Sequence, residues 1–226
     1  FSGDGRNGAL LALAAKTDPA AGAKGVSLFL VDAATPGFTR GQNLEKIGQH
    51  AGDTSELFFN DMRVPLDALL GGVEGQGFVQ MMRELPRERL IIGVQAVHGA
   101  KGALDATLKY VQERQAFGQP IGQFQNTRFT LAQCASDIAA AEAFLNASVA
   151  AYERGELSPE AASALKLHTT EVMGRVADAC LQLFGGYGYM AEYPISRFWT
   201  DARVLRIYGG TSEIMKELVA RSLLGR

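Results

Sequence analysis

Glu88 is a carboxylate at a position where the helical pattern of the sequence expects an apolar side chain. The segment RELPRERLIIGV, residues 83–94, continues a run of apolar positions at steps of three and four, and Glu88 falls in the gap between Leu85 and Ile92. Two interpretations are open. The carboxylate can be buried in an ion pair with one of the neighbouring arginines. It can instead be a general base in a dry pocket, where loss of solvent raises its proton affinity toward what removal of a proton from carbon requires.

Three further segments carry residue types that could bind a ligand. RIYGGTSEIM, residues 206–215, places two glycines before a Thr-Ser helix cap, so it could offer backbone N–H groups to an oxyanion or phosphate, or form only a tight turn. In ERQAFGQPIGQFQ, residues 113–125, Arg114 could bind a ligand or only interact with a helix dipole. The glycine pair in QLFGGYGYMAEYP, residues 182–194, could be part of a site or a simple helix C-cap.

The first third of the chain reads as strands and turns. The runs ALLALAAKT, KGVSLFLVD and TSELFFNDMRVP favour β-structure and are bounded by turn residues. The glycine-rich LLGGVEGQGF that follows could cradle a phosphate, but its glycine order does not fit the known motifs, and an interdomain hinge is the preferred interpretation. We therefore expect a β-domain segment over residues 1–73 and a helical domain over residues 74–226.

The remainder of the chain has helical periodicity. The pattern predicts a first helix from Gly77 to Phe117, kinked at Pro86 and ended by Gly118. It predicts a second helix over residues 124–154 and a third over residues 159–184, with Ser158 as N-cap. A last helix should follow a Thr211 or Ser212 cap. Four amphipathic helices with short connections predict an antiparallel bundle.

Composition excludes only broad classes of function. A net charge of −2 gives no electrostatic footprint for nucleic acid or an anionic membrane. No apolar run reaches the roughly 18 residues of a membrane helix, and no targeting segment is visible. Cys134 and Cys180 fall in apolar helical patterns, which indicates buried, reduced thiols and a cytoplasmic location. The three histidines lack ligand spacing, so no metal site is expected.

The order and separation of these segments closely resemble the acyl-CoA dehydrogenase flavoprotein family. GDTSELFFNDMRVP is similar to the end of that family's middle β-domain, and residues from about 74 onward resemble its C-terminal helical domain. The resemblance implies an α+β multi-domain fold, in which a partial antiparallel β-barrel segment precedes an antiparallel four-helix bundle. It also implies an FAD-dependent oxidoreductase of fatty-acid β-oxidation that converts a saturated acyl-CoA to a trans-2-enoyl-CoA, with the β-hydrogen leaving as hydride to flavin N5.

The resemblance gives the motif residues roles. Many members carry the catalytic base immediately before Gly-Thr-Ser, where this chain has Gly209. Members of the long-chain and isovaleryl types carry it in a segment like residues 85–90, which makes Glu88 the implied base. Arg89, Gly209 and Gly210 are implied to contact the substrate. The implied FAD contacts are Arg114, Phe117, Gln125, Gln182, Leu183, Phe184, Gly185, Gly186, Thr211, Ser212 and Glu213.

The resemblance also implies partners. FAD held across a subunit interface implies a homo-oligomer, a dimer or a tetramer, and an electron-transfer flavoprotein is the expected electron acceptor. The family's N-terminal helical domain and the first part of its β-domain have no counterpart in these residues, so we expect a fragment of a complete enzyme. Two alternatives stay open: a non-catalytic helical module of the same fold, and an acyl-CoA oxidase that passes electrons to oxygen.

Overall fold

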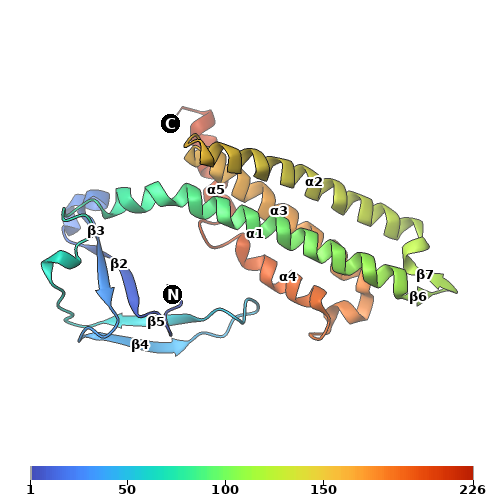
Figure 1. Cartoon of the computed structure of the whole chain (residues 1–226), viewed down its shortest axis with the longest axis horizontal. Coiled ribbons are helices and arrows are strands. Elements are labelled where there is room, and N and C mark those ends of the chain that lie inside the picture. The colour runs from blue at the N-terminus through green and yellow to red at the C-terminus, as the bar shows by residue number, and fades with distance from the viewer. Residues whose placement is uncertain (1, 226) are drawn as a thin grey trace. The chain divides into compact units, whose positions relative to one another are not determined.

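The computed structural model describes residues 2–225. The chain forms two compact units, of which one ends at Glu84 and the other begins at Leu85 (Figure 1). The division falls inside helix α1 (Gly77–Glu113), next to Pro86. The expected boundary after residue 73 lies in the glycine-containing turns that precede this helix.

The first unit is built from antiparallel strands. Its strands are β1 (Ser2–Gly3), β2 (Leu10–Lys16), β3 (Val26–Asp32), β4 (Phe38–Asn43) and β5 (Thr54–Phe59), with short 3-10 helices at Pro19–Gly25 and Leu66–Ala68. One sheet has the order β1-β5-β4, and β2 and β3 form a separate hairpin in which Leu10 pairs with Asp32 and Lys16 with Val26. The three strands predicted from sequence are confirmed, whereas β1 and β4 were not predicted.

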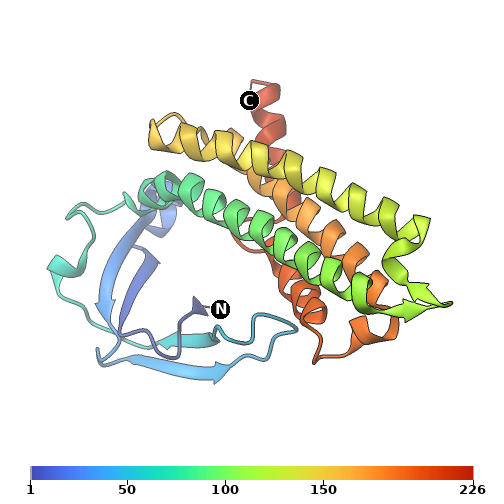
Figure 2. The same ribbon diagram turned by 45° about the vertical axis from the view of Figure 1, so that its right-hand side comes forward.

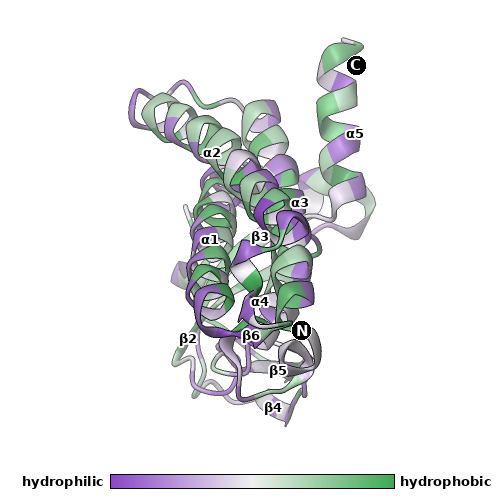
Figure 3. Cartoon of the chain, turned by 90° about the vertical axis from the view of Figure 1, so that its right-hand side faces the viewer, coloured by the Kyte–Doolittle hydropathy of each residue, from purple (hydrophilic) through white to green (hydrophobic). Residues whose placement is uncertain are grey.

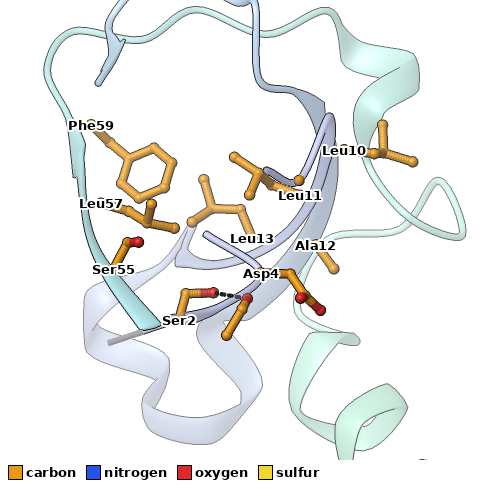
Figure 4. A pocket seen from close by; sticks show the side chains of 11 residues that line it. Ser2, Asp4, Leu10, Leu11, Ala12, Leu13, Ser55, Leu57 and Phe59 are labelled. Atoms are coloured by element: carbon orange, nitrogen blue, oxygen red, sulfur yellow. Dashed lines mark hydrogen bonds between the residues drawn. The ribbon is translucent and has the colours of Figure 1, made fainter. Parts of the chain in front are cut away.

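A cavity of about 510 Å³ lies between the two sheets of this unit. Leu11 and Leu13 of β2 point into it toward Leu57 and Phe59 of β5 (Figure 4). The side chains of β2 alternate between half-buried and exposed, as period-two patterning requires. The two sheets thus share one apolar interior, which fits the expected barrel segment.

The second unit is helical. After α1 come α2 (Gln125–Glu153), α3 (Pro159–Phe184), α4 (Pro194–Leu205) and α5 (Ser212–Leu223). Helix α3 is central, because it packs against α2, α4 and α5 (Figures 1 and 2). One continuous core joins α1 through Ala96, Ala100 and Ala103 to α2 and α3, and it includes both cysteines, which are buried free thiols.

The local helix signals are mostly confirmed. Helices α2 and α3 begin and end within one residue of the prediction, and the Ser158 side chain caps α3 by accepting a hydrogen bond from the Ala161 N–H at 3.1 Å. The predicted end of α1 at Phe117 is wrong. The helix ends at Glu113, and a small hairpin of β6 (Gln115–Ala116) and β7 (Gln119–Pro120) follows. Phe117 and Gly118 form its turn, with φ of 50° and 79°.

The helical unit contains one helix more than expected. Helix α4 was not predicted, and both it and the predicted last helix, α5, pack against α3 (Figures 1 and 2). The final helix, α5, extends beyond the other helices, and hydrophobic and hydrophilic residues alternate along its length (Figures 2 and 3). Leu223 at its end is 81% exposed. No helix among residues 2–225 combines the length and the apolar character needed to cross a bilayer.

Candidate functional site

Glu88 is exposed, so the burial predicted from the helix pattern is wrong. The buried stripe of α1 runs instead through Arg89, Ile92 and Ala96, again at steps of three and four residues. Ile92 and Ala96 belong to the expected stripe as well, so the observed stripe differs from it only in burying Arg89 in place of Glu88. Glu88 lies at the edge of that stripe, one turn from the exposed Ile91, whose side chain is 55% exposed.

Arg89 is the charged residue that α1 buries, with 6% of its surface exposed. Its Nη1 donates a hydrogen bond to the Ser163 hydroxyl at 3.1 Å, while its buried Nε has no partner. Burial lowers the pKa of the Arg89 guanidinium, and the negative charge of Glu88 opposes that shift. Glu88 and Arg89 are thus electrostatically coupled neighbours at one edge of the bundle.

The glycine pair between α4 and α5 lies against the same stretch of α1. Gly209 and Gly210 have φ of 64° and 101°, in the left-handed region that glycine tolerates. A Cβ at residue 209 would lie 2.5 Å from Cδ1 of Ile92, one helical turn beyond Glu88. The preceding residue is tied to α1 as well, since the Tyr208 hydroxyl donates to Oε1 of Gln95 at 2.7 Å.

The backbone of this turn has N–H groups without a partner among the described residues. Within residues 2–225, the N–H groups of Gly209 and Gly210 donate no hydrogen bond. The turn is closed behind them by the Ser212 N–H, which donates to the Arg206 carbonyl at 3.1 Å. Free N–H groups beside a helix start are suited to stabilise a developing negative charge.

Helix α3 supports the turn from the inside. The Lys166 ammonium donates to the Gly210 carbonyl, and Lys166 is fully buried. Glu171 holds both flanks, since its carboxylate accepts from the Ser212 hydroxyl at 2.7 Å and from Arg206 Nη1 at 3.3 Å. Lys166 lies on the buried stripe of α3, so the argument that singled out Glu88 could also have found it.

Thr211, Ser212 and Glu213 form the start of α5. The Thr211 hydroxyl caps the helix by accepting from the Ile214 N–H at 3.4 Å, as the sequence predicted. Ser212 is buried, and Glu213 is exposed. Hydrogen bonds from its own backbone N–H and from the Thr211 side chain lower the pKa of the Glu213 carboxyl.

Most of the other candidate residues meet in a second place, a pocket of about 550 Å³ near the end of α3. This pocket brings together six residues that the sequence singled out from two separate segments. They are Arg114, Gln182, Leu183, Phe184, Gly185 and Gly186. Phe117 and Gln125 are outside the lining: Phe117, at the hairpin tip, is 96% exposed, and Gln125 is the exposed first residue of α2.

An aromatic wall borders the second pocket, and it combines rings of the segment 182–194 with Tyr110 of α1, which was not predicted. The rings of Tyr110 and Phe184 stack with centroids 4.0 Å apart, and the Tyr110 hydroxyl donates to the Phe184 carbonyl at 3.2 Å. The Arg114 guanidinium lies 5.3 Å from the centre of the Tyr187 ring. Tyr110 lies one turn before Arg114 on α1, which is the signal that could have identified it. Burial raises the pKa of the Tyr110 hydroxyl.

Residues 2–225 contain no group of three or more histidine, cysteine or carboxylate side chains placed to hold a metal ion. The described chain offers three features that could take part in chemistry. They are the exposed carboxylate of Glu88 beside the buried Arg89, the free N–H groups of the Gly209–Gly210 turn, and a separate pocket with aromatic and amide groups.

Comparison with known proteins identifies relatives of both units. The family model described as acyl-CoA dehydrogenase, C-terminal domain, matches residues 75–224. The mitochondrial long-chain specific acyl-CoA dehydrogenase of Sus scrofa is 46% identical over 89% of this chain and 47% of its own length. The acryloyl-CoA reductase (NADH) of Anaerotignum propionicum is 40% identical over the whole chain and 57% of its own length.

Solved structures agree with these matches. The crystal structure of an acyl-CoA dehydrogenase from Geobacillus kaustophilus superposes with a TM-score of 0.95 at 43% identity, covering 98% of this chain and 58% of that one. The chain thus spans about half the length of the curated relatives it matches.

Proposed function

Because this chain belongs to the acyl-CoA dehydrogenase family, we propose that it carries the base and FAD contacts for the α,β-dehydrogenation of a saturated acyl-CoA to the trans-2-enoyl-CoA. In this proposal the Glu88 carboxylate takes the α-proton of the thioester. FAD, when bound, accepts the β-hydrogen as a hydride at its N5 atom.

The observation that carries the proposal is the contact between the glycine turn and α1. A side chain at residue 209 would point at Ile92, one turn beyond Glu88. A base carried at position 209 and a base carried at Glu88 would therefore serve one place from two different elements, the glycine turn and α1. The lack of a side chain at Gly209 leaves that place to Glu88, and this arrangement supports Glu88 as the base.

The other residues of this edge suit the same step. Removal of the α-proton moves negative charge onto the thioester oxygen, and the free N–H of Gly209 is available to donate a hydrogen bond to that oxygen. Preorganised donors of this kind contribute roughly 2.7–4 kcal/mol in comparable sites. The buried Arg89 is the neighbour of Glu88 in the chain, and the charges of the two residues interact.

The second pocket fits part of FAD. A Cβ added at Gly185 or Gly186 would meet nothing within 4 Å, so the backbone there leaves room for a close approach. The aromatic wall offers a face for a flat ring, and Arg114 and Gln182 offer donors for its polar groups. We assign these residues, with Leu183 and Phe184, to FAD binding.

The remaining FAD contacts belong to the same proposal through the family resemblance. They are Phe117, Gln125, Thr211, Ser212 and Glu213. In that assignment the pocket and the hairpin hold the FAD of another subunit, so the working protein is a homo-oligomer. An electron-transfer flavoprotein is the proposed acceptor of the electrons.

Anaerobic flavin reduction in the FAD-loaded protein tests the base. A series of saturated acyl-CoA thioesters should bleach the flavin absorbance. Glu88→Gln should slow that bleaching by at least about 100-fold, because a positioned base contributes that much or more, while FAD stays bound. Asp105→Asn, an exposed carboxylate on the same helix, is the matched control and should bleach normally.

Three outcomes separate the alternatives. Normal bleaching in Glu88→Gln would show that another group is the base. A folded protein that holds no flavin would favour a non-catalytic module. Release of hydrogen peroxide in air at the rate of substrate consumption, without reduction of an electron-accepting dye, would identify an oxidase.

A further inference from the structure

The side chain of Lys166 is fully buried in α3, where a charged group is costly to keep. Its charge has little compensation. Arg89 nearby opposes the positive charge of the ammonium, and Glu171 is the acid that favours it. A methionine or leucine would fill a similar volume without this cost, so we expect the ammonium to bind a particular group nearby.

That group is the carbonyl of Gly210, which accepts a hydrogen bond from the ammonium. Gly210 and Gly209 are both in left-handed conformations, and their own N–H groups donate no hydrogen bond within the described chain. Two consecutive glycines have the widest backbone freedom of any residue pair. Without an external contact, the middle of this turn would have little to fix it.

Two residues of α3 hold different parts of the turn. Glu171 fixes its two ends through Arg206 and Ser212, while Lys166 fixes the carbonyl between them. The C=O and N–H of one trans peptide point in opposite directions. The Gly210 carbonyl shares its peptide with the Thr211 N–H, so holding that carbonyl toward α3 directs the Thr211 N–H away from α3. The same contact limits rotation about ψ of Gly210 and thereby restricts how the two glycines can reorient.

We propose that Lys166 is a positioning residue, which anchors the Gly209–Gly210 turn so that its free N–H groups stay aimed at the thioester carbonyl. The anchoring is a property of this chain alone, whereas the target of the N–H groups rests on the proposed dehydrogenation. Lys166 itself need not touch substrate or FAD.

Amide hydrogen exchange tests the anchor without any turnover. The reporter is the Ser212 N–H, which closes the turn on the Arg206 carbonyl. In Lys166→Met its exchange should be at least about 10-fold faster, because the turn opens more often. Lys101→Met, which removes a half-exposed lysine paired with Glu142 on the bundle surface, is the matched control and should leave the reporter unchanged.

Flavin reduction in the FAD-loaded protein tests the purpose of the anchor. Lys166→Met should lower kcat by about 10-fold or more, since a small displacement of a positioning group has effects of this size. KM should change less than 3-fold, because the N–H groups act on the charge that develops during reaction. Lys166→Arg keeps a charged donor, so it should restore part of the lost kcat and part of the lost protection of the Ser212 N–H. It also tests the proposal if Lys166→Met does not fold.

The outcomes distinguish this inference from the proposed function. Unchanged Ser212 exchange and unchanged kcat in a folded Lys166→Met protein would overturn the inference and leave the dehydrogenation intact. Faster exchange in a protein whose wild type never reduces its flavin would support the anchor and overturn the dehydrogenation. Faster exchange with an unchanged kcat would show that the anchor exists but does not serve the reaction, which also overturns the inference as stated.

Discussion

At residue 209, any side chain would collide with helix α1. Gly209→Ala places a Cβ 2.5 Å from Cδ1 of Ile92 and forces alanine to adopt a φ of 64°. The left-handed conformation costs about 1–2 kcal/mol, and overpacking adds about 1–3 kcal/mol. We expect Gly209→Ala to lower the free energy of unfolding by roughly the sum of these.

Ile92→Val separates the two causes, because it removes the Cδ1 atom that the new methyl group meets. Urea unfolding of the two single variants and the double variant should show a loss in the double variant smaller than the sum of the single losses by about 1 kcal/mol or more. Strict additivity would mean that the backbone conformation alone, and not the contact with α1, requires glycine here.

Lys166 makes stability depend on pH. Burial, with the charge of Arg89, lowers its pKa from 10.5 to about 8. Below about pH 8 the lysine is protonated in both the folded and the unfolded chain, so the cost of the buried charge is fully present. Between about pH 8 and 10.5 the unfolded chain holds the proton that the folded chain has lost, and stability from this group rises with pH.

The comparison of wild type with Lys166→Met isolates this effect from other titrating groups. Relative to wild type, the methionine variant should be most stable near pH 7, and its advantage should shrink by up to about 3 kcal/mol by pH 10. Denaturant unfolding at a series of pH values measures the difference. An advantage that stays constant with pH would contradict the lowered pKa of Lys166.

At the scale of elements, features set by neighbouring residues could be predicted from the sequence, whereas contacts between distant segments could not. The Ser158 and Thr211 caps, and with them the starts of α3 and α5, could be read from adjacent residues, because a capping hydroxyl bonds only two or three residues ahead. The convergence of Arg114 with the segment 182–186 came from family resemblance. Nothing in the local sequence brings residues so far apart to one pocket.

Three predictions from the sequence were wrong or incomplete, and each has an identifiable reason. Residues 88 and 89 both lie three or four positions from Leu85 and from Ile92, so the spacing alone does not determine that Arg89 is buried and Glu88 exposed. The sequence around Gly118 was taken for a helix stop, since glycine serves both a helix C-cap and a hairpin turn. Helix α4 is short but clearly amphipathic, and Pro194 stands at its start, so the sequence carries a helix signal there that the prediction missed.

The hairpin between α1 and α2 gives a prediction of its own. Gly118 has a φ of 79°, and a Cβ there would meet nothing within 4 Å, so a substitution carries only a conformational cost. Gly118→Ala should destabilise the protein by about 1 kcal/mol, and Gly118→Asn by less, because asparagine tolerates the left-handed region better than alanine does. Urea unfolding measures both values, and an asparagine variant as unstable as the alanine variant would argue against this turn conformation.

At the scale of the whole molecule, the two units differ sharply in how much they bury. Among the described residues before Leu85, Val31 and Phe38 are the buried apolar side chains, whereas the helical unit has a continuous core. Among residues 2–225, the hairpin of β2 and β3 pairs with no third strand and has only an isolated bridge from Phe29 to Leu69 beside it. Two-stranded hairpins are marginally stable by themselves. The strand unit should therefore open more easily than the helical unit.

Hydrogen exchange of the intact chain measures this difference directly. Paired amides of β2 and β3 should exchange on the order of 100-fold faster than amides in the buried middle of α3, because local opening requires less buried surface to be exposed. The first two turns of α1, residues 77–84, should follow the strand unit, since they belong to it. Equal protection throughout would mean that both units open in one cooperative step. The division at Glu84 would then describe the packing of the chain but not separate unfolding of the two units.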